Sequence, residues 1–149
     1  MTKAEEHARQ LAGFYHSAEP SVICEKMGVV TLEQDLPPCV KGFTLAMNGT
    51  HFIVLNNVLA DDDKRFTLAH ELGHIILHKG TNSLQLRCQT DFCVTKYERE
   101  ADGFAAWLLL LSELSELSGR ESVTAEEAAR IAHIPPAVAQ TVFIEDAGV

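Results

Sequence analysis

The residues best suited to catalysis are His70 and His74, which enclose Glu71 in the pattern H-E-x-x-H. On an α-helix, side chains four positions apart lie on one face and one turn apart, so the two imidazoles can bind the same cation. Glu71 then points toward the remaining coordination positions, where its carboxylate can take a proton from a metal-bound water molecule. The spacing therefore predicts one catalytic zinc ion, with His70 and His74 as ligands and Glu71 as the general base.

A catalytic zinc site needs a third protein ligand and leaves the fourth position to water. Downstream, Glu98 and Asp102 share a helix face, whereas Glu100 lies about 200° around the helix from Glu98. This geometry favours Glu98 as the third ligand. Asp102 lies one turn further on, where it can accept the spare ring N–H of a ligand histidine and fix its tautomer. The alternative for Glu98 is a capping box with Thr95, whose T-x-x-E spacing also fits.

His78 follows His74 at the same spacing, but it lies one further turn, about 5–6 Å, along the helix axis. That is too far for it to bind the ion that His70 and His74 share. We interpret His78 as a histidine that interacts with the C-terminal end of the helix dipole, or as a wall of the substrate pocket. The group that stabilises the oxyanion is not fixed by the sequence, and His78, Tyr97 and Arg99 are candidates. His78 and Tyr97 are also expected to contact the substrate.

Helices and short strands must position these residues. The dipeptide Asn48-Gly49 between two apolar runs is a strong hairpin signal, and Asp61 to Asp63 offer an N-cap and first-turn acids to the helix that carries the motif. That helix and the next one carry small residues, Gly73 on the first and Ala101 on the second, so their backbones can approach closely. Periodicity predicts helices over residues 2–15, 20–26, 61–79, 95–117, 124–132 and 136–144, and strands over 29–33, 42–47 and 51–56.

Two segments are expected to contact a substrate or to move. The strand from His51 to Asn56, including Phe52, Ile53 and Val54, precedes the motif helix and is predicted to pair with an extended substrate through an exposed edge. Residues 81–91 are polar and irregular, and we expect them to form a mobile loop.

The composition is that of an ordinary globular protein, with 149 residues, 46% hydrophobic and 22% charged. We expect a single domain over residues 1–149, with the C-terminal helical pair from about residue 121 as part of it. The longest apolar run, residues 104–111, is far shorter than the ~20 residues of a membrane span, and the N-terminus does not resemble a signal peptide. We therefore expect a cytoplasmic protein without a membrane partner. Four cysteines without a C-x-x-C pair fit reduced thiols, although a role for Cys88 and Cys93 stays open.

The net charge of −9 disfavours nucleic acid as a direct partner. The C-terminal helical pair resembles a helix-turn-helix, yet residues 121–149 carry five acids against the single base Arg130. Such a segment repels phosphates, so packing against the core is favoured over DNA binding.

Two stretches together resemble the ImmA/IrrE family of metallopeptidases. The first is Arg65-Phe66-Thr67-Leu68-Ala69 leading into the H-E-x-x-H motif, and the second runs from Glu98 to Ala106. The resemblance implies a small zincin-like, gluzincin-like α+β fold. In that fold a three-stranded antiparallel sheet packs on the H-E-x-x-H helix, a second long helix carries a ligand, and further helices follow at the C-terminus. It also implies zinc ligands at His70, His74 and Glu98, with Glu71 as the general base.

The resemblance further implies a function. Members of the family are encoded near prophages or mobile elements and act on helix-turn-helix repressors. We therefore expect a zinc-dependent endopeptidase that hydrolyses a peptide bond in a transcriptional repressor. The alternative is a regulator of the anti-repressor type, which is stabilised by zinc and binds its partner without cutting it.

Overall fold

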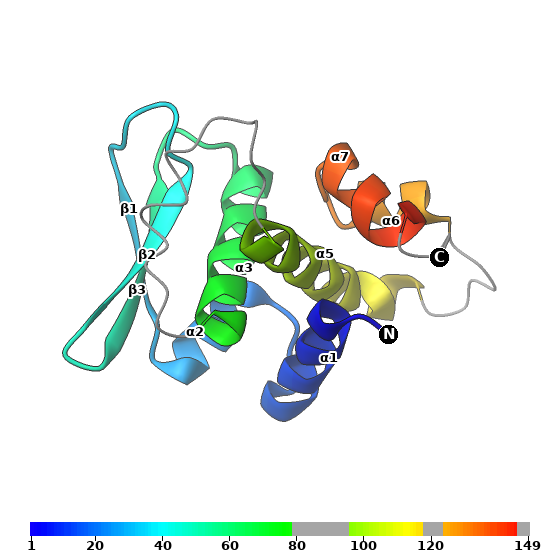
Figure 1. The fold of residues 1–149 in the computed structure, drawn as a ribbon, viewed down its shortest axis with the longest axis horizontal. Helices are drawn as coiled ribbons and strands as arrows, with labels where there is room; N and C mark the ends of the chain where they lie inside the picture. Colours follow the sequence, from blue (N-terminus) through cyan, green and yellow to red (C-terminus); the bar gives the residue numbers. More distant parts are fainter. Residues whose placement is uncertain (79–95, 118–123, 146–149) are drawn as a thin grey trace.

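The computed structural model describes residues 1–78, 96–117 and 124–145, which form an α+β fold (Figure 1). A three-stranded sheet packs on one side of helix α3, and helix α5 packs on α3 and also contacts α1. The predicted class, a sheet on the motif helix followed by a second long helix and C-terminal helices, is confirmed. The elements are α1 (Lys3–Tyr15), α2 (Pro20–Met27), β1 (Val30–Gln34), β2 (Gly42–Met47), β3 (Thr50–Asn56), α3 (Asp61–Leu77), α5 (Lys96–Leu117), α6 (Ala125–Ile131), α7 (Pro136–Ala139) and the π-helix η1 (Gln140–Glu145).

The sheet has the strand order β1-β3-β2. Strands β2 and β3 form the predicted antiparallel hairpin, and Asn48 and Gly49 both have positive φ, 52° and 80°, as a type I′ turn requires. Strand β1 runs parallel to β3, with Val30 opposite Phe52, so the prediction of a fully antiparallel sheet is wrong for this pair. The turn residues fix only β2 against β3. The direction of β1 depends on the path of residues 35–41, which carries no comparable local signal.

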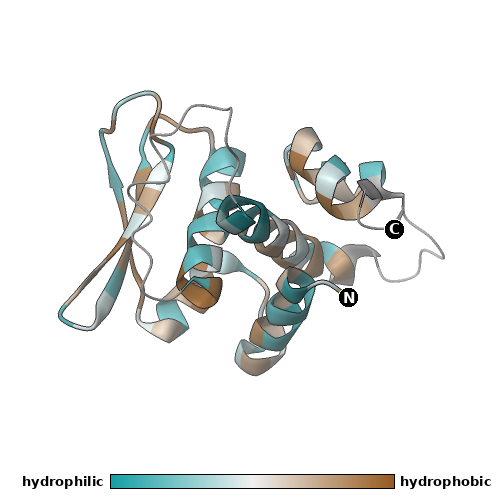
Figure 2. Cartoon of the chain, in the orientation of Figure 1, coloured by the Kyte–Doolittle hydropathy of each residue, from teal (hydrophilic) through white to brown (hydrophobic). Residues whose placement is uncertain are grey.

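The close packing of α3 on α5 depends on Gly73. A methyl group at Gly73 would lie 3.0 Å from Cδ1 of Phe104 and 3.3 Å from both Cα and the carbonyl oxygen of Ala101. Phe104 and Ala101 are themselves fully buried. The predicted close approach of the two backbones is therefore confirmed. Figure 2 shows the polar first turns of α5 in teal and its later, more apolar turns largely in brown and white.

We expect Gly73→Ala to destabilise the protein, although alanine is the better helix former. The propensity gain is about 1 kcal/mol, whereas overpacking against a neighbouring backbone costs about 1–3 kcal/mol, so the free energy of unfolding should fall by up to about 2 kcal/mol. Gly13→Ala is the matched control, since Gly13 is an exposed position of α1 with nothing within 4 Å of an added methyl group. Urea denaturation should show that variant to be stabilised by about 0.5–1 kcal/mol. An equal gain at both positions would contradict the close helix contact.

Helix ends agree with most of the sequence signals. Thr124 and Glu127 form a complete capping box at α6, and the Thr2 hydroxyl accepts a hydrogen bond from the Glu5 backbone N–H at α1. At α3 the N-cap is Ala60, and the three aspartates occupy the first turn instead of the cap. There they still face the positive end of the helix dipole. The predicted C-terminal helical pair packs against α5, where the rings of Trp107 and Phe143 meet edge to face at 5.0 Å.

Arg65 links three helices near the N-terminal half of α3. Its guanidinium donates to both carboxylate oxygens of Glu19, at 3.2 and 2.9 Å, and to the hydroxyl of Ser112 at 2.6 Å. Glu19 is the N-cap residue of α2 and Ser112 lies in α5, so Arg65 links α3 to both helices.

Several sequence predictions concern residues outside the described ranges. The predicted mobile loop over residues 81–91 and the possible roles of Cys88 and Cys93 are among them. Of the remaining cysteines, Cys24 is buried and Cys39 is exposed, and both are free thiols. Burial raises the pKa of Cys24 to about 12, which keeps this thiol protonated. Across residues 1–78, 96–117 and 124–145, no helix is long and apolar enough to cross a membrane.

Candidate metal centre

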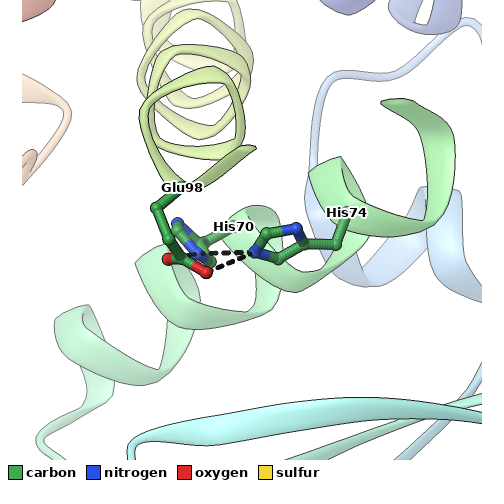
Figure 3. A group of neighbouring side chains, drawn as sticks. All are labelled: His70, His74 and Glu98. Carbon is green, nitrogen blue, oxygen red and sulfur yellow. Dashed lines mark hydrogen bonds and ion pairs between the residues drawn. The ribbon is translucent and has the colours of Figure 1, made fainter. Parts of the chain in front are cut away.

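Three side chains from two helices meet at the contact between α3 and α5. His70 and His74 project from α3, and Glu98 reaches them from the first turn of α5 (Figure 3). Within the described part of the chain, these residues form a group whose possible ligand atoms all lie within 4.8 Å of one another. Both histidines are 3% exposed, so the group is closed off from bulk water on the α3 side.

The spacing of the facing nitrogen and oxygen atoms fits a tetrahedral ion. Nε2 of His70 and Nε2 of His74 are 3.1 Å apart. The carboxylate oxygens of Glu98 lie 3.0 Å from the first nitrogen and 3.1 Å from the second. A tetrahedral zinc ion with bonds of about 2.0–2.1 Å holds its ligand atoms roughly 3.3–3.4 Å apart. The residues present therefore fit such an ion, and only a small outward shift would accommodate it.

Proton placement supports the same assignment. Nδ1 of His70 lies 2.7 Å from a carboxylate oxygen of Asp102, which can only accept, so this ring nitrogen carries the proton. In the neutral ring with its proton on Nδ1, the lone pair of Nε2 faces Glu98 and His74 and can bind a cation. A carboxylate and imidazole lone pairs that face one another at about 3 Å are stabilised by a cation between them. Asp102 lies where the sequence predicted it, one turn after Glu98.

Glu71, the predicted general base, follows His70 in α3 and is fully buried. Its position next to the histidine pair is set by the helix itself, which needs no other element to bring the two together. The alternative role for Glu98, a cap formed with Thr95, involves a residue outside the described ranges. In the structure, the Glu98 carboxylate lies against both histidines.

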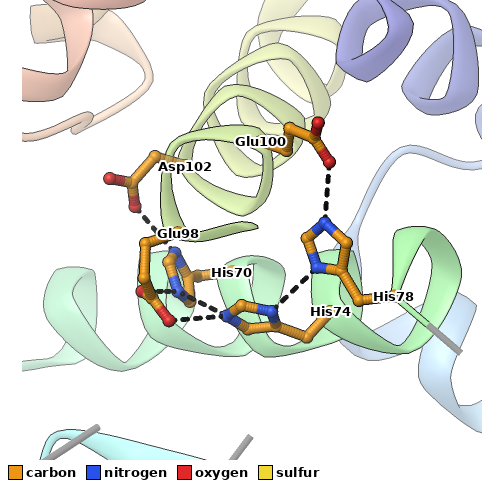
Figure 4. Close-up of polar contacts among 6 residues, drawn as sticks. All are labelled: His70, His74, His78, Glu98, Glu100 and Asp102. Carbon is orange, nitrogen blue, oxygen red and sulfur yellow. Dashed lines mark hydrogen bonds and ion pairs between the residues drawn. The ribbon is translucent and has the colours of Figure 1, made fainter. Parts of the chain in front are cut away.

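His78 lies four residues after His74 and is not part of the group formed by His70, His74 and Glu98. Its side chain is 2% exposed, with Nδ1 3.0 Å from Nδ1 of His74 and Nε2 2.8 Å from a carboxylate oxygen of Glu100 (Figure 4). The ring of Tyr97 packs on it at a centroid distance of 4.5 Å. His78 thus binds two side chains rather than acting mainly on the helix dipole, and it has little surface left for a substrate. A substrate contact for Tyr97, which is 45% exposed, stays a prediction.

The pKa values of His78 and Glu100 both lie below their ordinary values. Burial lowers the pKa of His78, and the hydrogen bond with Glu100 opposes that shift only in part. Burial raises the pKa of Glu100, but the hydrogen bond from His78 and the nearby Lys3 outweigh it and leave that pKa below its usual value. Sequence reasoning missed Glu100, because it lies on the face of α5 opposite Glu98. The available signal was the row of histidines at four-residue spacing. Its last member, His78, lies too far along the helix to share the ion, so its ring needs a polar partner from another element.

The predicted substrate strand needs a correction. Strand β3 is the central strand, and its backbone pairs with β1 on one side and β2 on the other. Residues 52–56 of β3 therefore have no free edge, and the prediction that this stretch pairs with an extended substrate is wrong. The physical reason is that β1 occupies the edge that the sequence left open. Ile53 and Val54 are buried in this sheet, whereas His51 is exposed, and a substrate contact for the side chains of His51 and Phe52 stays a prediction.

Two packed helices bring two histidines and a glutamate together. This is the arrangement that the sequence predicted for a gluzincin-like fold. The chain belongs to the Peptidase_M78 family, the IrrE N-terminal-like domain, whose model matches residues 24–134. The match runs from α2 to the turn after α6, so it includes the sheet and both helices of the candidate site. The predicted ImmA/IrrE membership is confirmed.

A phage protein is also similar. Over 96 residues the chain is 32% identical to the protein named "Uncharacterized immunity region protein 2" from Bacillus phage phi105. The aligned region covers 64% of this chain and 61% of that relative, so the chain spans less than two thirds of its length.

Proposed function

We propose that this protein is a zinc-dependent endopeptidase. The observation that carries the proposal is the convergence of His70, His74 and Glu98 at about 3 Å from one another. Glu71, which follows His70 in the same helix, is fully buried. Membership of a peptidase family supports it. Three side chains that can hold a cation, and a glutamate on the same helix that can act as a base, would meet the two requirements of metal-assisted hydrolysis.

The residues of the chain have separate roles in this mechanism. A bound zinc ion supplies a Lewis acid that polarises the scissile carbonyl and lowers the pKa of a water molecule to about 7. Glu71 accepts the proton of the attacking water and passes it to the leaving amine. Asp102 accepts the Nδ1–H of His70 at 2.7 Å and so keeps the Nε2 lone pair of that ring directed at the site.

The proposed substrate is a helix-turn-helix repressor of a prophage or mobile element in the cytoplasm. Two findings support this class of substrate, namely the family and a relative that its name places in the immunity region of a phage. The net charge of −9 supports a protein partner over nucleic acid.

The two functional hypotheses differ in what happens to the repressor. We expect the zinc-loaded full chain, incubated with the repressor encoded beside its gene, to yield two fragments, and excess chelator to prevent the cleavage. Electrophoresis and mass spectrometry of the fragments provide the measurement. A stable complex without fragments would overturn the endopeptidase and support the alternative, a zinc-stabilised regulator that does not hydrolyse its partner.

A further inference from the structure

A chain of hydrogen bonds continues from His74 away from the candidate metal centre. It passes from Nδ1 of His74 to Nδ1 of His78 over 3.0 Å, and from Nε2 of His78 to a carboxylate oxygen of Glu100 over 2.8 Å (Figure 4). The His78 side chain is 2% exposed and the Glu100 side chain 19% exposed, and Tyr97 covers the His78 ring. The mechanism proposed above uses neither His78 nor Glu100.

The positions of the protons follow from what each atom can do. A carboxylate only accepts, so Nε2 of His78 carries a proton and donates it to Glu100. Two ring nitrogens at 3.0 Å share one proton, and a neutral His78 presents a lone pair at Nδ1. The shared proton therefore belongs to Nδ1 of His74. In a neutral His74, the Nε2 atom, which faces His70 and Glu98, then has the lone pair that binds a cation.

The two ligand histidines are thus oriented in different ways. His70 donates directly to the carboxylate of Asp102, whereas His74 is linked to the carboxylate of Glu100 through His78. Both arrangements leave Nε2 unprotonated toward the centre. In Figure 4, Glu98 and Asp102 lie on one flank of α5 and Glu100 on the other. The start of this helix therefore reaches His70 and His74 of α3 and also His78, the C-cap residue of α3.

We propose that His78 and Glu100 are positioning residues for the metal ligand His74. Glu100 holds the proton on Nε2 of His78, and His78 accepts the Nδ1–H of His74. This fixes the tautomer and the ring orientation in which the Nε2 lone pair of His74 points at the ion. The inference rests on the proposed function only in that His70, His74 and Glu98 bind a metal.

The first test measures zinc affinity by competition with a chromogenic chelator, using the full chain and zinc alone. We expect His78→Ala to bind zinc about 10- to 100-fold more weakly than the wild type. His78→Asn should recover much of the affinity, because its Oδ1 lies near the place of Nδ1 and can accept the same proton. Glu100→Gln should lose less affinity than Glu100→Ala for the corresponding reason. His133→Ala is the control and should bind like the wild type, since this exposed histidine lies in the turn after α6.

The second test observes the ring protons of His74 and His78. A purely structural role for His78 would not require them to lie on particular nitrogen atoms. Long-range ¹H–¹⁵N spectra of the zinc-loaded wild type should show His78 as the Nε2–H tautomer and His74 with its proton on Nδ1. This measurement needs no variant, so it decides the matter even where His78→Ala does not fold.

The outcomes separate the inference from the function on which it rests. A proton on Nδ1 of His78, or unchanged zinc affinity in His78→Ala and Glu100→Ala while His70→Ala has lost zinc, overturns the inference and leaves the metal site intact. Failure of the wild type to bind zinc more tightly than His70→Ala overturns the proposed function, and the inference with it.

Discussion

Replacing Glu71 by glutamine should abolish peptide hydrolysis while one zinc ion per chain stays bound. Glutamine has nearly the same shape as glutamate, so it fits the fully buried position of Glu71 in α3, but it cannot accept a proton. General-base catalysis contributes about 10²- to 10⁴-fold, and we expect kcat to fall by at least that factor with little change in KM. The rate of fragment formation and the zinc content by mass spectrometry measure the two parts of this prediction.

The control for Glu71→Gln is the same change at Glu126, an exposed position in α6. That variant should cleave at the wild-type rate, because Glu126 lies on α6, whereas the histidine pair and Glu71 lie on α3. Cleavage by Glu71→Gln at the wild-type rate would remove Glu71 from the mechanism. Loss of zinc together with cleavage would show that the substitution disturbs the site rather than the proton transfer.

Replacing Glu98 by alanine should remove zinc binding and, with it, the stabilisation that zinc confers. The variant lacks the carboxylate that contacts both histidines, at 3.0 and 3.1 Å, and that we propose as the third ligand. The fall in affinity should therefore exceed the 10- to 100-fold change typical of residues that only orient a ligand. Zinc at about a hundred times its Kd stabilises a protein by about 2.7 kcal/mol, which corresponds to a rise in Tm of roughly 5–10 °C for a chain of this size.

Thermal unfolding with and without zinc tests this prediction directly. The wild type should show the rise in Tm, Glu98→Ala should show none at the same zinc concentration, and Glu25→Ala, an exposed position in α2, should behave like the wild type. An undiminished rise in Glu98→Ala would show that Glu98 is not a ligand. The capping role with Thr95 would then be the better explanation of its position in the sequence.

Much of the candidate site follows from spacing along single helices. His70 and His74 share a face because they are one turn apart, and Glu98 and Asp102 do so for the same reason. The structure places all four where this geometry expects them, with Nδ1 of His70 against Asp102 and Nε2 of His70 against Glu98. Their roles in binding metal are proposals that the experiments above address.

Pairing between distant segments could not be predicted in the same way. The dipeptide Asn48-Gly49 determines the hairpin of β2 and β3, because the turn type depends on two adjacent residues. The parallel placement of β1 beside β3 depends on contacts between strands about twenty residues apart, which no local pattern encodes. The error about the substrate strand followed from this, since a strand paired on both sides cannot add another.

The helix that carries H-E-x-x-H, the hairpin of β2 and β3 and the face from which each candidate ligand projects could all be predicted from the residues. These depend on helical periodicity and turn chemistry, which act over a few residues. The contact between Glu100 and His78 depends on the packing of two helices and could not be predicted from local patterns. Glu100 lies in α5 and His78 directly follows α3, and these two helices pack closely at Gly73. Helical spacing puts Glu100 on the flank of α5 away from Glu98, and from that flank its side chain reaches His78. Which flanks of a helix face its neighbour depends on how the side-chain ridges of one helix fit the grooves of the other, and both surfaces contribute to that fit.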